Sequence, residues 1–319
     1  MSIAIMCSGG DAPGMNPAVK RFVDYVLFNK KIPYFIYNGI EGLIDNNIKQ
    51  ATPKDVSGIL HRGGSIIGSS RSKRWYEKKY RKIAYNNLKK RGIESILVLG
   101  GDGSFKGMNL FCNEFDIRFV GIPATIDNDI AGTEYCIGVD TALNVIRDAS
   151  DKIRDTASTF KRGFVIETMG RECGYLCATS AIACGAELCL IPEVDLDLDL
   201  AKKILLKEIK NGRNYVLCFV AEGVKKTDYM VDWIEKNLGF ETRKSILGYI
   251  QRGGNPTVFE RLMAFEFVVR AVDILLRSEK SNIVIGYKEG KFQELDIKDV
   301  AGKKYHISQH ILDMLNYID

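Results

Sequence analysis

Short runs of β-branched and apolar residues alternate with longer amphipathic segments along almost the whole chain. Several of the short runs are apolar on both faces, which is typical of parallel strands covered by helices on each side. We expect strands at 3–7, 34–37, 95–99, 118–122, 163–167, 187–191, 215–221 and 282–285. We expect helices at 77–91, 141–159, 200–211, 229–238, 258–277 and 308–317.

Two further helices are predicted from their start signals. Asn16 precedes Pro17 and is a candidate N-cap, and Thr52 precedes Pro53 in the same way. The alternation of strands and helices predicts an α/β fold with open parallel sheets, and 319 residues are enough for two such sheets. Composition alone does not place the boundary, because no linker-like Pro/Ser tract interrupts the chain.

The composition excludes several classes of protein. With 46% hydrophobic and 27% charged residues the chain is neither collagen-like nor disordered, and a net charge of +5 favours a small anionic ligand over nucleic acid. The eight cysteines include no Cys-x-x-Cys pair and only three histidines are present, so we expect reduced thiols and no zinc site. The N-terminus does not read as a signal peptide, and no apolar run approaches the ~20 residues that span a bilayer. We therefore expect a cytoplasmic protein without membrane contact.

Glycine-rich segments follow two of the expected strands, where open parallel sheets bind their ligands. Gly9-Gly10 lacks both the dinucleotide-binding spacing and the P-loop ending, and is equally consistent with a phosphate cradle and a tight turn. Asp102 lies inside the second loop, GGDGS (100–104). A carboxylate among phosphate-binding amides calls for a cation such as Mg²⁺, although a helix N-cap is an alternative role for Asp102.

Charged residues also follow the next strands. Asp127 and Asp129 lie two positions apart, so in an extended segment they point to the same side and can share a metal, or divide metal binding and proton transfer between them. Arg171 follows a glycine at the end of the next strand, where its guanidinium can reach a phosphoryl group. Together these residues predict Mg²⁺-dependent phosphoryl transfer to a small anionic acceptor.

A basic segment, 71–91, contains ten Lys or Arg residues and one acidic residue, with aromatic residues between them. We interpret it as a solvated helix face beside an anion site, because no nucleic-acid motif accompanies it.

The strand ends resemble those of bacterial ATP-dependent 6-phosphofructokinases. The matching segments are SGGDAPGMN (8–16), RGG (62–64), GSSR (68–71), GGDGS (100–104), PATIDND (123–129), MGR (169–171) and GYIQRGG (248–254). The resemblance implies two Rossmann-like three-layer α/β/α domains, with residues 1–137 and 252–304 binding ATP and residues 138–251 and 305–319 binding sugar phosphate. It also implies a homotetramer with shared active sites, which transfers the γ-phosphate of ATP to the 1-hydroxyl of fructose 6-phosphate.

The same resemblance implies a role for each matching residue. Asp127 corresponds to the general base, Asp102 and Asp129 to the magnesium-associated carboxylates, and Thr125 and Arg171 to contacts of the transferred phosphoryl group. The ATP site corresponds to Gly9, Arg71, Ser72, Gly101, Asp102, Gly103 and Ser104. The sugar-phosphate site corresponds to Thr125, Asp127, Met169, Gly170, Arg171, Glu222, Tyr249 and Arg252, with Arg162 and Arg243 lent by a neighbouring subunit.

The chain departs from the family pattern at several positions. Tyr249 replaces a histidine, and Ala124 replaces a glycine. Gly103 and the small residue at 124 leave room for ATP, where pyrophosphate-dependent relatives have Asp and Lys. The effector site corresponds to Lys20, Arg154, Gly185, Glu187 and Arg213. Asp24 falls where an arginine is common, so we expect weakened control by ADP or phosphoenolpyruvate.

Three alternative functions stay open on the sequence. The first is a pyrophosphate-dependent phosphofructokinase. The second is another kinase with a GGDG loop, acting on a dinucleotide or a lipid. The third is a non-catalytic nucleotide- or RNA-binding protein that uses the basic segment 71–91.

Overall fold

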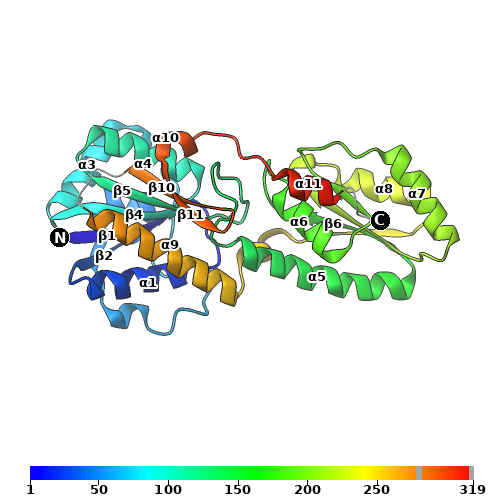
Figure 1. Ribbon diagram of the computed structural model, residues 1–319, viewed down its shortest axis with the longest axis horizontal. Helices are drawn as coiled ribbons and strands as arrows, with labels where there is room; N and C mark the ends of the chain where they lie inside the picture. The colour runs from blue at the N-terminus through cyan, green and yellow to red at the C-terminus, as the bar shows by residue number, and fades with distance from the viewer. Residues whose placement is uncertain (278–281, 316–319) are drawn as a thin grey trace. The chain divides into compact units, whose positions relative to one another are not determined.

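The computed structural model describes residues 1–277 and 282–315. The chain divides into two units, residues 1–141 with 252–305 and residues 142–251 with 306–319. Each unit contains a mostly parallel sheet with helices packed on it, which confirms the expected α/β fold (Figure 1). The assignment of ATP to one unit and of sugar phosphate to the other stays a prediction.

The first unit is built on a seven-stranded sheet with the order β11-β10-β5-β4-β1-β2-β3. Its strands are β1 (Ser2–Ser8), β2 (Ile32–Ile36), β3 (Ile48–Gln50), β4 (Ile93–Gly100), β5 (Arg118–Pro123), β10 (Asn282–Lys288) and β11 (Lys291–Asp296). The two edge strands, β3 and β11, pair antiparallel with their neighbours, and the others are parallel. Every residue of β1 is buried, as expected for a central strand covered on both faces.

Helices cover both faces of this sheet. They are α1 (Met15–Phe28), α2 (Gly39–Ile44), α3 (Lys78–Lys89), α4 (Asp102–Glu114), α9 (Val258–Leu276) and α10 (Ile297–Val300). Figure 1 shows α1 and α9 together on one face, with α3 and α4 on the other. The buried aromatic rings of Phe22 and Phe267 belong to the first layer, and that of Phe105 belongs to the second. Apolar side chains on both faces of the strands therefore form two cores.

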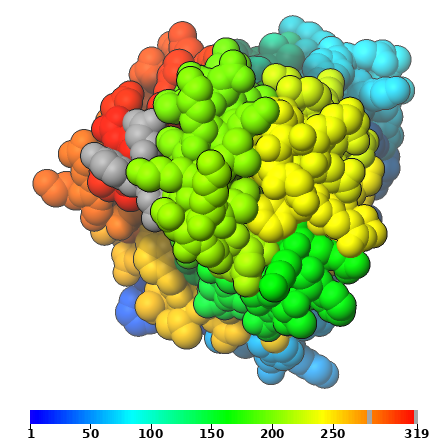
Figure 2. Space-filling view, turned by 90° about the vertical axis from the view of Figure 1, so that its right-hand side faces the viewer, coloured from blue at the N-terminus to red at the C-terminus, as the bar shows by residue number. Residues whose placement is uncertain are grey.

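The second unit contains a four-stranded parallel sheet with the order β7-β8-β6-β9. Its elements are β6 (Gly163–Thr168), β7 (Leu188–Leu190), β8 (Val216–Ala221), β9 (Thr242–Ile246), α5 (Val139–Phe160), α6 (Tyr175–Cys184), α7 (Leu198–Lys210), α8 (Thr227–Leu238) and α11 (Gln309–Leu315). α7 and α8 pack on one face of the sheet and lie next to each other on the surface seen in Figure 2. On the other face, Cys177 of α6 contacts Cys189 of β7.

Two expected helix starts differ from the structure. The N-cap expected at Asn16 is wrong, because α1 begins at Met15 with Gly14 as its N-cap. The Asn16 side chain instead donates to the carbonyl oxygens of Arg62 and Gly63 and accepts a hydrogen bond from the Ile66 amide. Asn16 therefore anchors a distant loop on α1. Local spacing along the chain can predict a helix start, but it cannot predict that the Asn16 side-chain amide binds a loop distant in the sequence.

The second expected helix start, at Thr52, leads only to one 3₁₀ turn, Pro53–Val56. The Asp55 carboxylate closes this turn by accepting hydrogen bonds from the Thr52 amide and hydroxyl.

Three strands were not expected: β3, β9 and β11. All three lie at sheet edges and are largely polar and exposed, so they lack the apolar run that marks a buried strand. Residues 316 and 317 of the last expected helix lie outside the described residues.

The structure shows no described helix that is long and apolar enough to cross a membrane.

A buried carboxylate joins the start of α9 to the segment that follows β5 in the first unit. Glu260 is fully buried and accepts hydrogen bonds from the Tyr135 hydroxyl and the Gly138 amide, each at 2.7 Å, and from the amide and hydroxyl of Thr141 at 3.2 Å. Burial raises the pKa of Glu260 to about 7, and these hydrogen bonds oppose the rise. Glu260 thus fixes residues 135–141 against α9.

We predict that Glu260 makes the stability of the first unit pH-dependent. Because its folded pKa is raised, the folded state binds a proton that the unfolded chain releases. This contribution is fully present below about pH 4.5 and is lost as the pH rises through about 7, with an upper limit of about 3 kcal/mol. Between pH 5 and 8, the Tm of wild type should fall more than that of Glu260→Gln. Glu266→Gln, which alters an exposed carboxylate on the same helix, is the control. Parallel Tm curves for wild type and Glu260→Gln would contradict the prediction.

Candidate active site

Three neighbouring strands of the first unit end at the same level of the sheet. In the parallel register of β1, β4 and β5, Ser8 lies opposite Gly100, and Gly100 lies opposite Pro123. The segments that begin at Gly9, Gly101 and Ala124 therefore leave the same sheet edge side by side. This arrangement places the Gly9-Gly10 loop, the GGDGS loop and the segment that contains Asp127 and Asp129 together. Ligands bind at such carboxyl ends of parallel strands.

Hydrogen bonds connect these segments to one another. The Ser104 hydroxyl, in the first turn of α4, lies 3.0 Å from the Ser8 carbonyl oxygen and 2.9 Å from the Ser8 hydroxyl. The Gly9 amide donates to the Ser70 carbonyl oxygen at 3.1 Å, and the Ser69 hydroxyl donates to the Gly9 carbonyl oxygen at 3.0 Å. Residues 69–72, which include the predicted ATP contacts Arg71 and Ser72, are thus held beside the first loop.

The GGDGS loop caps α4. Gly101 is the N-cap, so the alternative role of Asp102 as the N-cap is wrong, and Asp102 is the first residue of the helix. The amides of a first helical turn point out of the helix and favour an anion. A Cβ atom on Gly103 would meet nothing within 4 Å, so the start of α4 faces open space.

The segment after β5 is turned rather than extended. Asn128 has a φ of 51°, and its side chain donates to the Glu134 carbonyl oxygen at 2.9 Å. The extended conformation that would place Asp127 and Asp129 on one side is therefore not adopted, and the roles of the two aspartates stay a prediction. Asp127 is 1% exposed, and its amide donates to the Thr125 hydroxyl at 3.2 Å.

Arg252 reaches the first glycine loop. A Cβ atom on Gly10 would lie 2.6 Å from Nη1 of Arg252, so only glycine permits this approach. Nη1 also lies 3.6 Å from an Asp11 carboxylate oxygen. The Nε of Arg252 is buried and has no hydrogen-bond partner among the described residues.

In the second unit, the MGR segment follows β6 in a strained conformation. Arg171 has a φ of 54°, which non-glycine residues rarely adopt, and Gly170 has a φ of 140°. Oε1 of Glu222 accepts hydrogen bonds from the Gly170 and Arg171 amides at 3.2 and 2.8 Å. These bonds hold the strained turn, and strain held in this way is typical of functional segments.

Gln251 supports the same segment and was missed by sequence reasoning. Its side chain is fully buried, accepts a hydrogen bond from the Met169 amide at 3.1 Å and donates to the Gly248 carbonyl oxygen at 2.9 Å. Its place between Tyr249 and Arg252 in the GYIQRGG segment was the available signal.

The two arginines expected to serve a neighbouring subunit share one carboxylate. Arg162 and Arg243 both pair with Glu241, Arg162 at 2.9 Å. Tyr249 is 82% exposed.

The predicted effector residues are divided between the units. In the second unit, buried Glu187 pairs with Arg213 and accepts a hydrogen bond from the Leu217 amide at 2.6 Å. Burial raises the pKa of Glu187, and the positive charges of Arg213 and Arg154 oppose this rise. Gly185, two residues before Glu187, is the C-cap of α6. In the first unit, Lys20 pairs with Asp24 at 3.0 Å.

Comparison with known proteins identifies the family. A phosphofructokinase family model matches residues 2–275. The chain belongs to the phosphofructokinase family.

Several phosphofructokinases match the chain over most of its length. The ATP-dependent 6-phosphofructokinase of Sulfurimonas denitrificans is 53% identical over 315 residues, which cover 98% of each chain. That of a Sulfurovum species is 55% identical over 312 residues, covering 98% of this chain and 95% of the relative. A structure of phosphofructokinase from Saccharomyces cerevisiae superposes with a TM-score of 0.89 at 33% identity, covering 93% of this chain and 45% of that one. The resemblance drawn from the strand-end motifs is confirmed.

The residues predicted to hold magnesium, Asp102 and Asp129, supply two carboxylates. Among the described residues, no group of three or more His, Cys, Asp or Glu side chains is placed to hold a metal. Mg²⁺ is usually bound by one or two carboxylates together with phosphate oxygens and water, so two aspartates are a sufficient protein contribution. Asp102 accepts a hydrogen bond from the Gly302 amide and forms an ion pair with Lys106.

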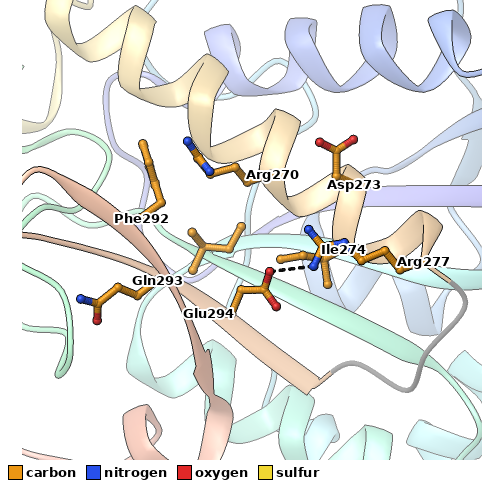
Figure 3. Close-up of a pocket in the computed structure, with 8 residues that line it drawn as sticks. Arg270, Asp273, Ile274, Arg277, Phe292, Gln293 and Glu294 are labelled. Carbon is orange, nitrogen blue, oxygen red and sulfur yellow. Dashed lines mark hydrogen bonds and ion pairs between the residues drawn. The ribbon is translucent and has the colours of Figure 1, made fainter.

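A pocket of about 110 Å³ lies elsewhere in the first unit, between α9 and the β10–β11 hairpin (Figure 3). Its charged side chains are paired within the protein: Arg277 with Glu294 at 3.0 Å, and Asp273 with the Tyr25 hydroxyl at 2.8 Å. It contains none of the residues predicted to bind ATP or sugar phosphate.

We predict that Gln251 keeps the MGR segment ordered. Gln251→Leu removes the acceptor of the Met169 amide, so hydrogen exchange in residues 168–171 should accelerate at least about tenfold, equivalent to a loss of about 1.4 kcal/mol of local protection. Exchange in β8 provides an internal control for global unfolding. Gln251→Glu keeps the acceptor oxygen and, when its carboxyl is protonated, also the donor to the Gly248 carbonyl oxygen, so it should restore protection at low pH. Unchanged exchange of Met169 in Gln251→Leu would remove the positioning role.

Proposed function

We propose that this chain transfers the γ-phosphate of ATP to the 1-hydroxyl of fructose 6-phosphate, giving fructose 1,6-bisphosphate and ADP. The observation that carries the proposal is the shared level at which β1, β4 and β5 end, which places the GG, GGDGS and TIDND segments at one sheet edge. The curated relatives at 53% and 55% identity are ATP-dependent 6-phosphofructokinases, which favours ATP over pyrophosphate as the donor.

The first unit holds the donor. ATP phosphates bind at the start of α4 and beside Gly9, where backbone amides and the helix dipole favour an anion. The open space at Gly103 supports this assignment, because a donor phosphate can approach the backbone there. Arg71 is exposed, and its segment is bonded to Gly9 through Ser69 and Ser70, so Arg71 supplies positive charge toward the nucleotide.

Asp127 takes the proton of the attacking sugar hydroxyl. The hydroxyl oxygen bonds to the γ-phosphorus, the bond from phosphorus to the ADP oxygen breaks, and the proton moves to the Asp127 carboxylate. A sugar hydroxyl is a poor nucleophile, and a positioned base contributes about 10²–10⁴ in rate. Asp127 is buried, and its backbone amide donates a hydrogen bond to the Thr125 hydroxyl; both observations support this role.

Cationic groups balance the phosphate charge. Asp102 and Asp129 would hold Mg²⁺, which neutralises charge on the phosphates when it is bound. Arg252 receives an anionic group of the sugar phosphate, which is supported by its buried Nε without a partner among the described residues. Arg171 stabilises the transferred phosphoryl group, and the Glu222 carboxylate, which accepts a hydrogen bond from the Arg171 amide, holds that arginine in place.

The active enzyme is a homotetramer in which Arg162 and Arg243 complete a neighbouring site. Each pairs with Glu241 within its own chain, and these partly exposed pairs are weak enough to exchange for a sugar phosphate. Control by ADP or phosphoenolpyruvate is weak, because Lys20, which corresponds to an effector-site residue, is paired with the Asp24 carboxylate.

Asp127→Asn tests the base. The variant should lower kcat by about a hundredfold or more while ATP binding is retained, because the amide keeps the shape but cannot take a proton. Turnover and ATP binding are measured separately, with Asp116→Asn on the surface as the control. Near-normal turnover by Asp127→Asn would remove Asp127 from the base role.

Gly103→Asp tests the donor site. The substituted side chain enters open space in a helix first turn, where a carboxylate does not destabilise the fold. Its charge should repel the ATP phosphates and lower kcat/KM for ATP by about tenfold or more, as a loss of about 1.4 kcal/mol would do. Wild type should use ATP and not pyrophosphate in a parallel assay. Equal use of both donors by wild type would contradict the proposed donor.

A further inference from the structure

Asp102, a proposed magnesium ligand, has both carboxylate oxygens engaged by other groups of the first unit. Oδ1 accepts a hydrogen bond from the Gly302 amide at 2.5 Å, and Oδ2 pairs with Nζ of Lys106 at 2.7 Å. Gly302 follows α10 and Lys106 lies one helical turn beyond Asp102 on α4. The segment after α10 therefore meets α4 at the same carboxylate.

Local geometry makes this contact specific. A Cβ atom on Gly302 would lie 2.9 Å from Cε of Lys106, and Gly302 has a φ of 78°. The lysine stem thus passes directly over the glycine while its ammonium group reaches Asp102. An acid four residues before a lysine is the favourable order on a helix.

Each carboxylate oxygen of Asp102 has one partner, and the ammonium group of Lys106 places a positive charge beside Oδ2. A cation that coordinates Oδ2 therefore competes with this ammonium group, and movement of the carboxylate toward the cation weakens the hydrogen bond from Gly302. The Lys106 side chain is 55% exposed and that of Asp102 is 30% exposed. Their ion pair is accordingly weak, and a divalent cation with its nucleotide can replace it.

We propose that Lys106 and the Gly302 amide hold Asp102 until Mg²⁺–ATP arrives, so that Lys106 sets the magnesium requirement of the enzyme. This inference rests on the proposed function. Lys106 is a positioning residue, since it acts through Asp102. Release of the Gly302 amide then links nucleotide binding to the segment that follows α10.

The first test measures the Mg²⁺ concentration for half-maximal activity at saturating ATP and fructose 6-phosphate. Lys106→Gln removes the competing cation and should lower this concentration about two- to fivefold. Lys106→Arg keeps the cation and should behave as wild type. Lys236→Gln, which removes a different helical pair with Asp232 at the same spacing, is the matched control and should have no effect.

The second test does not depend on turnover. Hydrogen exchange at the Gly302 amide should accelerate severalfold when Mg²⁺ and a non-hydrolysable ATP analogue are added, and should do so at lower Mg²⁺ in Lys106→Gln. An equal or higher magnesium requirement in Lys106→Gln, or Gly302 exchange that ignores Mg²⁺ and the analogue, would overturn the inference. If the wild-type protein does not phosphorylate fructose 6-phosphate, the proposed function is refuted. The hydrogen-exchange measurement at Gly302 then still tests whether Mg²⁺ and the nucleotide analogue displace its bond to Asp102.

Discussion

The parallel register of β1, β4 and β5 is the constraint on which the candidate active site depends. Because Ser8, Gly100 and Pro123 lie on one level, three segments far apart in the sequence begin at the same edge of the sheet. A shift of one residue in any of these strands would turn its side chains to the opposite face and move its loop along the edge. The buried apolar residues of the strands prevent such a shift, so the hydrophobic cores also position the backbone that we propose to bind phosphate.

Polar side chains then fix the loops that follow the strands. Glu260 accepts bonds from three residues of the segment 135–141, and Glu222 holds the left-handed turn at Arg171. Gln251 does the same for the Met169 amide. At buried Glu260 and Gln251 the acceptor replaces water that the donor has lost, so removing the acceptor leaves an unsatisfied donor.

Charged residues of the site are already engaged within the chain. Asp102 is held by Lys106 and Gly302, and Arg252 approaches Asp11. Such pairs keep the charges balanced. The pair of Asp102 with Lys106 is partly exposed and costs little to exchange, so in the proposed function binding of a charged substrate is an exchange of partners.

The motifs and the alternation of strands with helices identified the fold class, the family and the candidate residues, because periodicity and strand-end glycines are local properties of the sequence. Edge strands such as β9 were not predicted, because polar and exposed runs lack the apolar pattern that marks a buried strand. Only the tertiary structure decided that Asn16 anchors a loop, that the chain turns at Asn128 and that Gln251 supports the MGR segment. These features depend on partners up to 82 residues away, and no local pattern of residues records which distant groups the packed sheet will bring together.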